Sequence, residues 1–245
     1  MLFQATLEKL TVLKLFGMVA ALQEQMASPN ITQLSFEERL SLAVDREWNE
    51  REGKKLKTRL QEAKLKMNAA IEDIDFLTPR GLDRGMVLSL ATCEWITAHH
   101  HLLITGPTGV GKSYLANAFG YQACRLGYSV LNYRTSRFLD LVKGSRLDGR
   151  YPALVRKIQK MRLLILDDFG MVDFTPDDAR NLFDIFEDRN GTGSICLVSQ
   201  IPIEKWYDTI PLPTIADAIM DRLIHGSYRI EMRGESMRKK NTHLD

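Results

Sequence analysis

The stretch from residue 102 to residue 118, LLITGPTGVGKSYLANA, restricts the fold of this chain more than any other. An apolar run precedes a loop that fits the pattern G-x-x-x-x-G-K-[ST], and a segment with helical character follows it. Glycines let the backbone turn so that successive N–H groups meet phosphate oxygens, and the following helix adds its positive N-terminus. The stretch therefore predicts a strand, a phosphate-binding loop and a helix.

The loop also predicts the groups that bind a nucleoside triphosphate. Lys112 is expected to lie against the β- and γ-phosphates, and the Ser113 hydroxyl is expected to be a ligand of Mg²⁺. The nucleotide-binding set predicted here is Gly106, Pro107, Thr108, Gly109, Val110, Gly111, Lys112, Ser113 and Tyr114.

A second set of polar residues follows two later apolar runs. Asp167 and Asp168 come directly after Leu163–Leu166, at the carboxyl end of a predicted strand, where open α/β sheets gather their ligands. Asp167 is expected to hold Mg²⁺ and Asp168 to orient the attacking water. The next strand ends in Ser199 and Gln200, and either side chain could sense the γ-phosphate; we assign Ser199 to the catalytic set.

Arg222 completes the predicted catalytic set of Lys112, Asp168, Ser199 and Arg222. It lies in a helical stretch beyond the sheet, and an arginine offered by a neighbouring subunit can stabilise the charge that develops in phosphoryl transfer. The alternative is a surface ion pair with Asp221 or Asp217.

Apolar periodicity and turn residues organise the rest of the chain. The first seventy or so residues predict an all-helical unit, in which Ser35 and Glu38 form a capping box and Gly53 breaks a helix. Strands alternating with helices then predict a parallel sheet covered on both faces. We expect a helical domain over 1–72 and an α/β domain over 73–245. The expected helices are 7–26, 36–51, 54–70 and 84–97, and the expected strands are 102–105, 129–133, 163–166 and 195–199.

The composition of the chain limits which kinds of partner it can bind. The chain has 245 residues, 33 Lys and Arg against 31 Asp and Glu, and three cysteines without a Cys-x-x-Cys pair. No apolar run approaches a membrane span, so we expect no membrane partner and a cytoplasmic location. Because net charge is only +2, DNA contacts must come from local basic clusters, although such clusters are often solvated helix faces. The candidates are Lys54, Lys55, Lys57, Arg59, Arg137, Lys143, Arg146, Arg150, Arg156, Lys157 and Lys160.

Together GPTGVGKS, LLILDDFG, the strand ending in SQ and the MDRL segment resemble the AAA+ ATPases, in particular the IstB-like transposition helpers, which are related to the helicase loader DnaC. The segments LKLFGMVAAL, LSFEERLSLAVDREW and RGESMRKK extend the resemblance over nearly the whole chain. It implies a P-loop NTPase of AAA+ type that uses ATP and Mg²⁺, forms an ATP-dependent homo-oligomer on duplex DNA and delivers the target to a transposase encoded by the same element.

The resemblance also bears on single residues. Asp168 in place of the more usual Glu is typical of this helper branch, and Arg238 is a candidate for the second sensor arginine. Only 23 residues follow Arg222, which predicts a helical lid that is reduced or absent. The main alternative is a DnaC-like helicase loader. A small-molecule kinase would also carry a P-loop, but the sequence shows no Arg-rich lid, and a GTPase is disfavoured because no Asn-Lys-x-Asp motif occurs.

Overall fold

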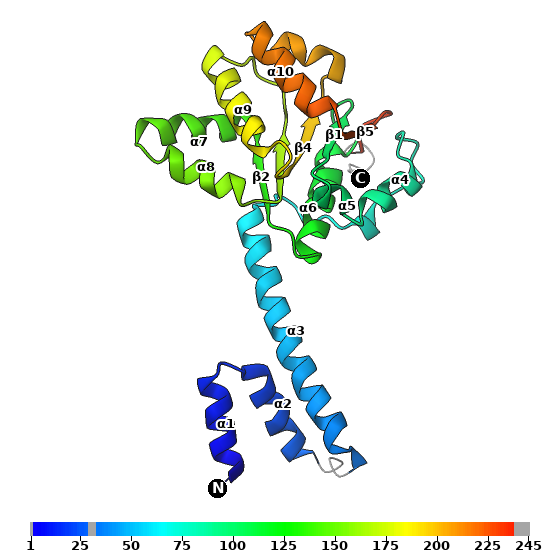
Figure 1. The fold of residues 1–245 in the computed structure, drawn as a ribbon. Coiled ribbons are helices and arrows are strands. Elements are labelled where there is room, and N and C mark those ends of the chain that lie inside the picture. Colours follow the sequence, from blue (N-terminus) through cyan, green and yellow to red (C-terminus); the bar gives the residue numbers. More distant parts are fainter. Residues whose placement is uncertain (1, 29–32, 238–245) are drawn as a thin grey trace, which may run out of the picture. The chain divides into compact units, whose positions relative to one another are not determined.

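The computed structural model describes residues 2–28 and 33–237 (Figure 1). Its contacts divide the chain into two compact units, residues 1–58 and residues 59–245. This division falls inside the helix α3 (Phe36–Ala63), whereas the sequence placed the domain boundary at residue 72.

The first unit contains α1 (Leu2–Val12), α2 (Phe16–Ala27) and most of α3. The prediction of one helix over 7–26 is wrong, because Lys14 takes a left-handed conformation (φ 59°) that ends α1. The Leu15 N–H then donates to the Leu10 carbonyl at 2.9 Å. The helices α2 and α3 approach closely at Gly17, whose N–H donates to the buried Glu47 carboxylate at 2.7 Å.

Two predictions about α3 can be compared with the structure. The capping box is confirmed, since the Ser35 N–H donates to Glu38 Oε2 (2.7 Å) and the Glu38 N–H donates to Ser35 Oγ (3.2 Å). The predicted break at Gly53 is wrong, because α3 continues through it. A glycine inside a helix costs only about 1 kcal/mol relative to alanine, too little to interrupt a helix of 28 residues.

The second unit is built on a five-stranded parallel sheet with the order β2-β3-β4-β1-β5 (Figure 1). All four predicted strands are confirmed within one residue at each end. The fifth, β5, was not predicted. The strands are β1 (His101–Thr105), β2 (Val130–Arg134), β3 (Leu163–Asp167), β4 (Ser194–Ser199) and β5 (Ser227–Glu231).

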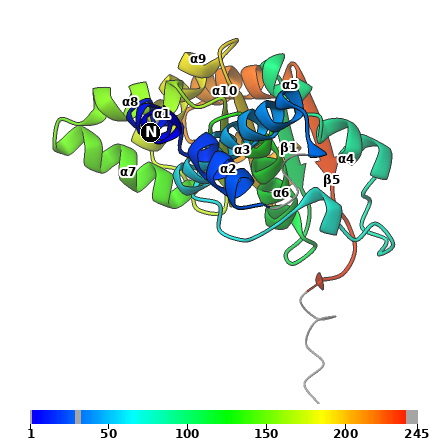
Figure 2. The ribbon, with the colours of Figure 1, turned by 90° about the horizontal axis from the view of Figure 1, so that it is seen from below.

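Helices cover both faces of this sheet, as predicted. One face packs its buried side chains, among them Leu103, Leu164 and Leu197, against α7, α8, α9 and α10. The other face packs against α6, where Gly120 lies over Val130 and Ile165. Figure 2 shows α7 and α8 side by side on one flank of this unit and α4 and β5 on the other. The helices are α4 (Arg84–Leu90), α5 (Glu94–Thr97), α6 (Lys112–Arg125), α7 (Thr135–Leu147), α8 (Tyr151–Gln159), α9 (Pro176–Arg189) and α10 (Pro213–Ile224).

Short 3₁₀ turns complete the second unit, at Ile71–Asp73, Ile203–Lys205 and Tyr207–Thr209. After α10 the described residues up to 236 form β5 and an irregular segment, so this part of the chain contains no helical lid. The predicted helix over 84–97 is divided into α4 and α5 at Cys93, whose φ is 59°. None of the described helices combines the length and the apolar content that a membrane span requires.

Candidate nucleotide site

The phosphate-binding loop connects β1 to α6 and is held in a conformation that depends on its glycines. Gly106, Gly109 and Gly111 have φ values of 145°, 85° and 103°, which residues with a Cβ rarely adopt. Gly111 is also the N-cap residue that directly precedes α6. The predicted order of strand, loop and helix is therefore present, with the N-terminus of α6 directed at the loop.

The C-terminal segment 232–237 lies against this loop. The Met232 N–H donates to the Thr105 carbonyl (2.7 Å), and the Met237 N–H donates to the Gly109 carbonyl (2.9 Å). A Cβ at Gly106 would collide with the Met232 carbonyl, and one at Gly109 would collide with the side chain of Ser236. The loop glycines are thus required by a neighbouring segment as well as by the loop's own backbone.

Lys112 points back over the loop. Its side chain is largely buried, and its Nζ donates to the Pro107 carbonyl at 2.8 Å. Burial lowers the pKa of Lys112, and the carboxylates of Asp167 and Asp168 oppose that shift. The ammonium group is therefore close to both the loop and the carboxyl end of β3, where a phosphate chain would need a cation.

Ser113 and Asp167 meet directly, since the Ser113 hydroxyl donates to Asp167 Oδ1 at 3.0 Å. Asp167 is 5% exposed, and burial followed by the charge of Asp168 raises its pKa. Mg²⁺ binds oxygen at about 2.1 Å in an octahedron, so adjacent ligands lie about 3 Å apart. The two oxygens fit adjacent positions of that shell, with phosphate oxygens and water left to complete it.

Asp168 is held by an ion pair across the sheet edge. Its backbone is left-handed (φ 59°), and its Oδ2 lies 3.0 Å from Nε of Arg134, the last residue of β2. The Asp168 N–H donates to Asp167 Oδ1 at 3.0 Å. The carboxylate predicted to orient water is thus at the expected edge, paired with a cation that the sequence analysis did not assign to the site.

Ser199 and Gln200 have different surroundings. Ser199 is fully buried, and its hydroxyl donates to the Phe169 carbonyl (2.7 Å) and accepts from the Ile201 N–H (3.0 Å). Both hydrogen-bonding functions of this hydroxyl are used within the fold. The side chain that reaches the loop is Gln200, whose Oε1 accepts a hydrogen bond from the Thr108 hydroxyl.

Arg222 lies on α10 and contacts α9. It forms an ion pair with Glu187, donates to the Ala218 carbonyl (2.9 Å) and lies over the Phe183 ring at 5.2 Å. The alternative considered for Arg222 was an ion pair with Asp221 or Asp217, and the ion pair present is with Glu187. Arg238 lies outside the described residues.

Three cavities among the described residues border the loop, and two of them match parts of a nucleotide. One of about 270 Å³ lies beside Gly111 and is lined by Ile74, Tyr114 and Met232 among others. The other, of about 510 Å³, is lined on one side by Thr108 and Gln200 and on the other by Arg134 and Asp168. Most side chains that line the first cavity are apolar, although Asp73, Asp75 and Arg80 also line it, and the second cavity is charged. These linings suit a base and a phosphate chain respectively.

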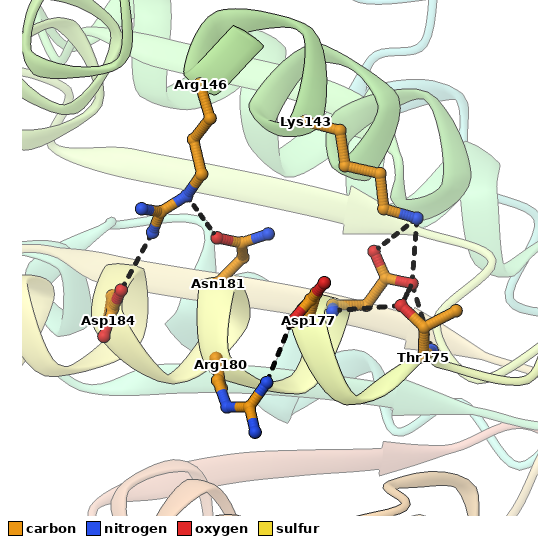
Figure 3. Close-up of polar contacts among 8 residues, drawn as sticks. Lys143, Arg146, Thr175, Asp177, Arg180, Asn181 and Asp184 are labelled. Carbon is orange, nitrogen blue, oxygen red and sulfur yellow. Dashed lines mark hydrogen bonds and ion pairs between the residues drawn. The ribbon is translucent and has the colours of Figure 1, made fainter.

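Several of the predicted DNA-binding residues have partners inside the fold. Lys143 Nζ lies 2.9 Å from the carboxylate of Asp178. Figure 3 shows Arg146 bonded to Asn181 and Asp184. These pairs join α7 to α9. Arg150 pairs with Asp148, Lys54 with Glu50 and Lys55 with Glu52, and Arg59 is partly buried.

The remaining candidates are exposed. Within residues 2–28 and 33–237 they form no ion pair. Three of them lie at the C-terminal end of α8, at spacings that place them on one side of its last turn. These exposed residues are Lys57, Arg137, Arg156, Lys157 and Lys160.

Comparison with known proteins identifies the family. A family model described as IstB-like ATP binding protein matches residues 8–244. The chain belongs to the IstB-like family. An insertion sequence ATP-binding protein of Sinorhizobium fredii is 44% identical over 239 residues, which cover 98% of each chain.

Solved structures agree with the fold of this IstB-like protein. The DnaC helicase loader aligns with a TM-score of 0.58 at 16% identity, over 69% of this chain and 99% of that one. The replication initiator DnaA, bound to AMPPCP and single-stranded DNA, aligns with a TM-score of 0.60 at 19% identity, over 74% of this chain and 58% of that one. At these identities the likeness shows the AAA+ fold.

Proposed function

We propose that this IstB-like protein is a Mg²⁺-dependent ATPase that oligomerises on duplex DNA, selects or remodels a target site for the transposase of its insertion sequence, and is released by ATP hydrolysis. The observation that carries the ATPase part is the hydrogen bond between Ser113 and Asp167, next to a loop whose Lys112 ammonium group is bonded to the Pro107 carbonyl. The name of the Sinorhizobium fredii relative, an insertion sequence ATP-binding protein, supports the transposition part.

In this proposal the protein residues bind and orient the nucleotide. Mg²⁺, held by Ser113 and Asp167, would neutralise charge on the phosphate chain. Lys112 exchanges its hydrogen bond with the Pro107 carbonyl for one with the phosphates. The base occupies the cavity of about 270 Å³ beside Gly111.

Hydrolysis then depends on the carboxylate of Asp168. In the structure this carboxylate is paired with Arg134, so it must leave that partner, or share it, in order to accept a hydrogen bond from the attacking water. Gln200 takes the sensing role in place of Ser199, because its amide is beside Thr108 of the loop while the Ser199 hydroxyl is buried and bonded.

Arg222 acts from a neighbouring subunit. Its contacts within its own subunit are to α9 and to its own helix. In the part of the chain that the structure describes, none is to the phosphate-binding loop, which favours a role at another subunit's phosphates. Arg222→Ala should therefore lower hydrolysis in assemblies and leave isolated subunits unchanged. Arg238 is kept as a second sensor candidate.

DNA binding falls to the exposed cations. Arg156, Lys157 and Lys160 are unpaired in the described structure and can contact phosphates without sequence preference. Lys57 extends the proposal to the helical N-terminal domain, 1–72, as a DNA- or partner-binding part of the chain. Replacing the three α8 cations with alanine should reduce the slope of log affinity against log salt by about 0.9 for each lost phosphate contact.

The decisive experiment separates binding of ATP from its use. Asp168→Asn should still protect duplex DNA with ATP and should fail to hydrolyse it or to release the DNA. Asp173→Asn is the matched control, because Asp173 lines the same charged cavity without an ion pair among the described residues. Hydrolysis by Asp168→Asn at the rate of the control would refute the role of this carboxylate. ATP-independent protection, or protection by monomers, would refute the assembly mechanism.

A helicase loader is the competing function. The likeness to DnaC shows the fold alone, so it does not favour this alternative. Copurification with the transposase of the neighbouring gene supports the proposal, whereas stable binding to a replicative helicase in place of that transposase would contradict it.

A further inference from the structure

Arg80 is a buried arginine that belongs to none of the sequence motifs. It lies in the segment before α4 and is 6% exposed, although arginine is rarely buried without partners. Its Nη1 donates to the Val110 carbonyl at 3.0 Å, and its Nη2 donates to the Asp75 carbonyl. A guanidinium group therefore joins the phosphate-binding loop to the segment that precedes α4.

The bond to Val110 fixes the direction of a loop N–H group. The Val110 carbonyl and the Gly111 N–H belong to one peptide unit, and in a trans peptide they point in opposite directions. Because Arg80 holds the carbonyl on its own side, the Gly111 N–H is turned away from Arg80. A Cβ on Gly111 would lie 2.7 Å from Arg80 Nη1, so this close approach requires glycine.

We propose that Arg80 is a positioning residue for the nucleotide site, which orients the Gly111 N–H toward the phosphates before a nucleotide binds. The inference rests on the proposed ATP-binding function. A donor that is already oriented needs no reorganisation when an anion arrives, so the affinity for phosphates rises. The backbone carbonyl of Arg80 also accepts a hydrogen bond from the Arg233 N–H (2.8 Å). This bond connects the segment after β5 to the segment that contains Arg80.

The peptide unit in question can be observed alone. Val110–Gly111 is the single Val-Gly pair in the sequence. Labelling valine with ¹³C at the carbonyl and glycine with ¹⁵N therefore isolates one N–H signal in an NMR spectrum, that of Gly111. Arg80→Ala should shift or broaden this signal and the Val110 carbonyl resonance. The matched control is Arg84→Ala, an exposed arginine four residues further on, which should leave both unchanged.

Affinity for inorganic pyrophosphate, measured by displacement of a fluorescent ADP analogue, tests the consequence. Pyrophosphate has no base, so it reports on the phosphate-binding loop. A lost hydrogen bond to a charged group predicts affinity roughly tenfold to a hundredfold weaker in Arg80→Ala. Guanidinium ion at millimolar concentration should restore the affinity and the Gly111 signal, whereas ammonium should not.

Wild-type pyrophosphate affinity with an unchanged Gly111 signal in Arg80→Ala would overturn the inference. If that variant does not fold, Arg80→Met replaces it, since methionine fills much of the same buried volume but has no N–H group to donate; wild-type behaviour of Arg80→Met would overturn the inference equally. Failure of the proposed function looks different. The wild-type protein would then bind neither ADP nor pyrophosphate, while the Gly111 signal would still report whether Arg80 holds the peptide unit.

Discussion

Protonation of His101 should make the second unit unstable in acid. This side chain begins β1, is 4% exposed, and accepts a hydrogen bond at Nδ1 from the Ile195 N–H of β4 (3.2 Å). Burial, followed by the charges of Arg189 and His100, lowers its pKa to about 4 from an ordinary value of 6.5. The neutral imidazole is therefore a part of the folded state.

The sign and the size of the effect follow from linkage. Between pH 6.5 and pH 4 the unfolded chain binds a proton at His101 and the folded chain does not, so stability falls as the pH is lowered through this window. The loss in free energy of unfolding is about 2 kcal/mol at pH 5 and approaches a limit of about 3 kcal/mol below pH 4, because each pKa unit corresponds to about 1.4 kcal/mol.

The assay is urea unfolding between pH 4 and pH 8, followed by the fluorescence of the buried Trp95 and Trp206. His101→Asn keeps an acceptor for the Ile195 N–H but does not titrate, so its stability should be less dependent on pH by the stated amounts. His225→Asn, at an exposed histidine, is the matched control and should behave as the wild type. Identical pH slopes in His101→Asn and the wild type would refute the reasoning.

Four further substitutions test the packing and the surface charges described above. Gly53→Ala should raise the free energy of unfolding by about 0.5–1 kcal/mol, because nothing lies within 4 Å of the added Cβ in the exposed part of α3. Gly17→Ala, the matched change in α2, should lower the free energy of unfolding, since its Cβ would lie 2.7 Å from the Glu47 Cα. A higher melting temperature for Gly17→Ala than for Gly53→Ala would contradict both predictions. Lys143→Ala should cost about 1–2 kcal/mol by leaving a buried carboxylate short of a partner, whereas Lys157→Ala should leave stability unchanged and weaken DNA binding in a filter assay.

The parts of the fold that local sequence determines were predictable. The buried strands β1, β3 and β4 each contain a continuous apolar run, and the loop before α6 has a spacing that few other structures share. The edge strand β5 gave no such signal, because only Ile230 among its five residues is buried. Helix breaks at Lys14 and Cys93 depend on left-handed residues that are not glycine, so composition did not reveal them.

The site assignments that the sequence left open or did not make depend on tertiary contacts. Ser199 and Gln200 follow one another at a strand end, and only the fold shows which of the two side chains faces the loop. In the sequence Lys143 cannot be distinguished from the other cations of its cluster, and only the fold shows that α9 places the Asp178 carboxylate next to it. Arg80 lies thirty residues from Val110 in sequence, and no local pattern relates the two.

The contact between segment 232–237 and the phosphate-binding loop affects how mutations in that loop can be interpreted. A side chain added at Gly106 or Gly109 displaces Met232 or Ser236 as well as altering the loop itself. The phenotype of such a variant would therefore combine the loss of nucleotide binding with the loss of the packing between segment 232–237 and the loop. Lys112→Ala, which removes a side chain and adds none, is the allele from which the contribution of ATP can be inferred without that ambiguity.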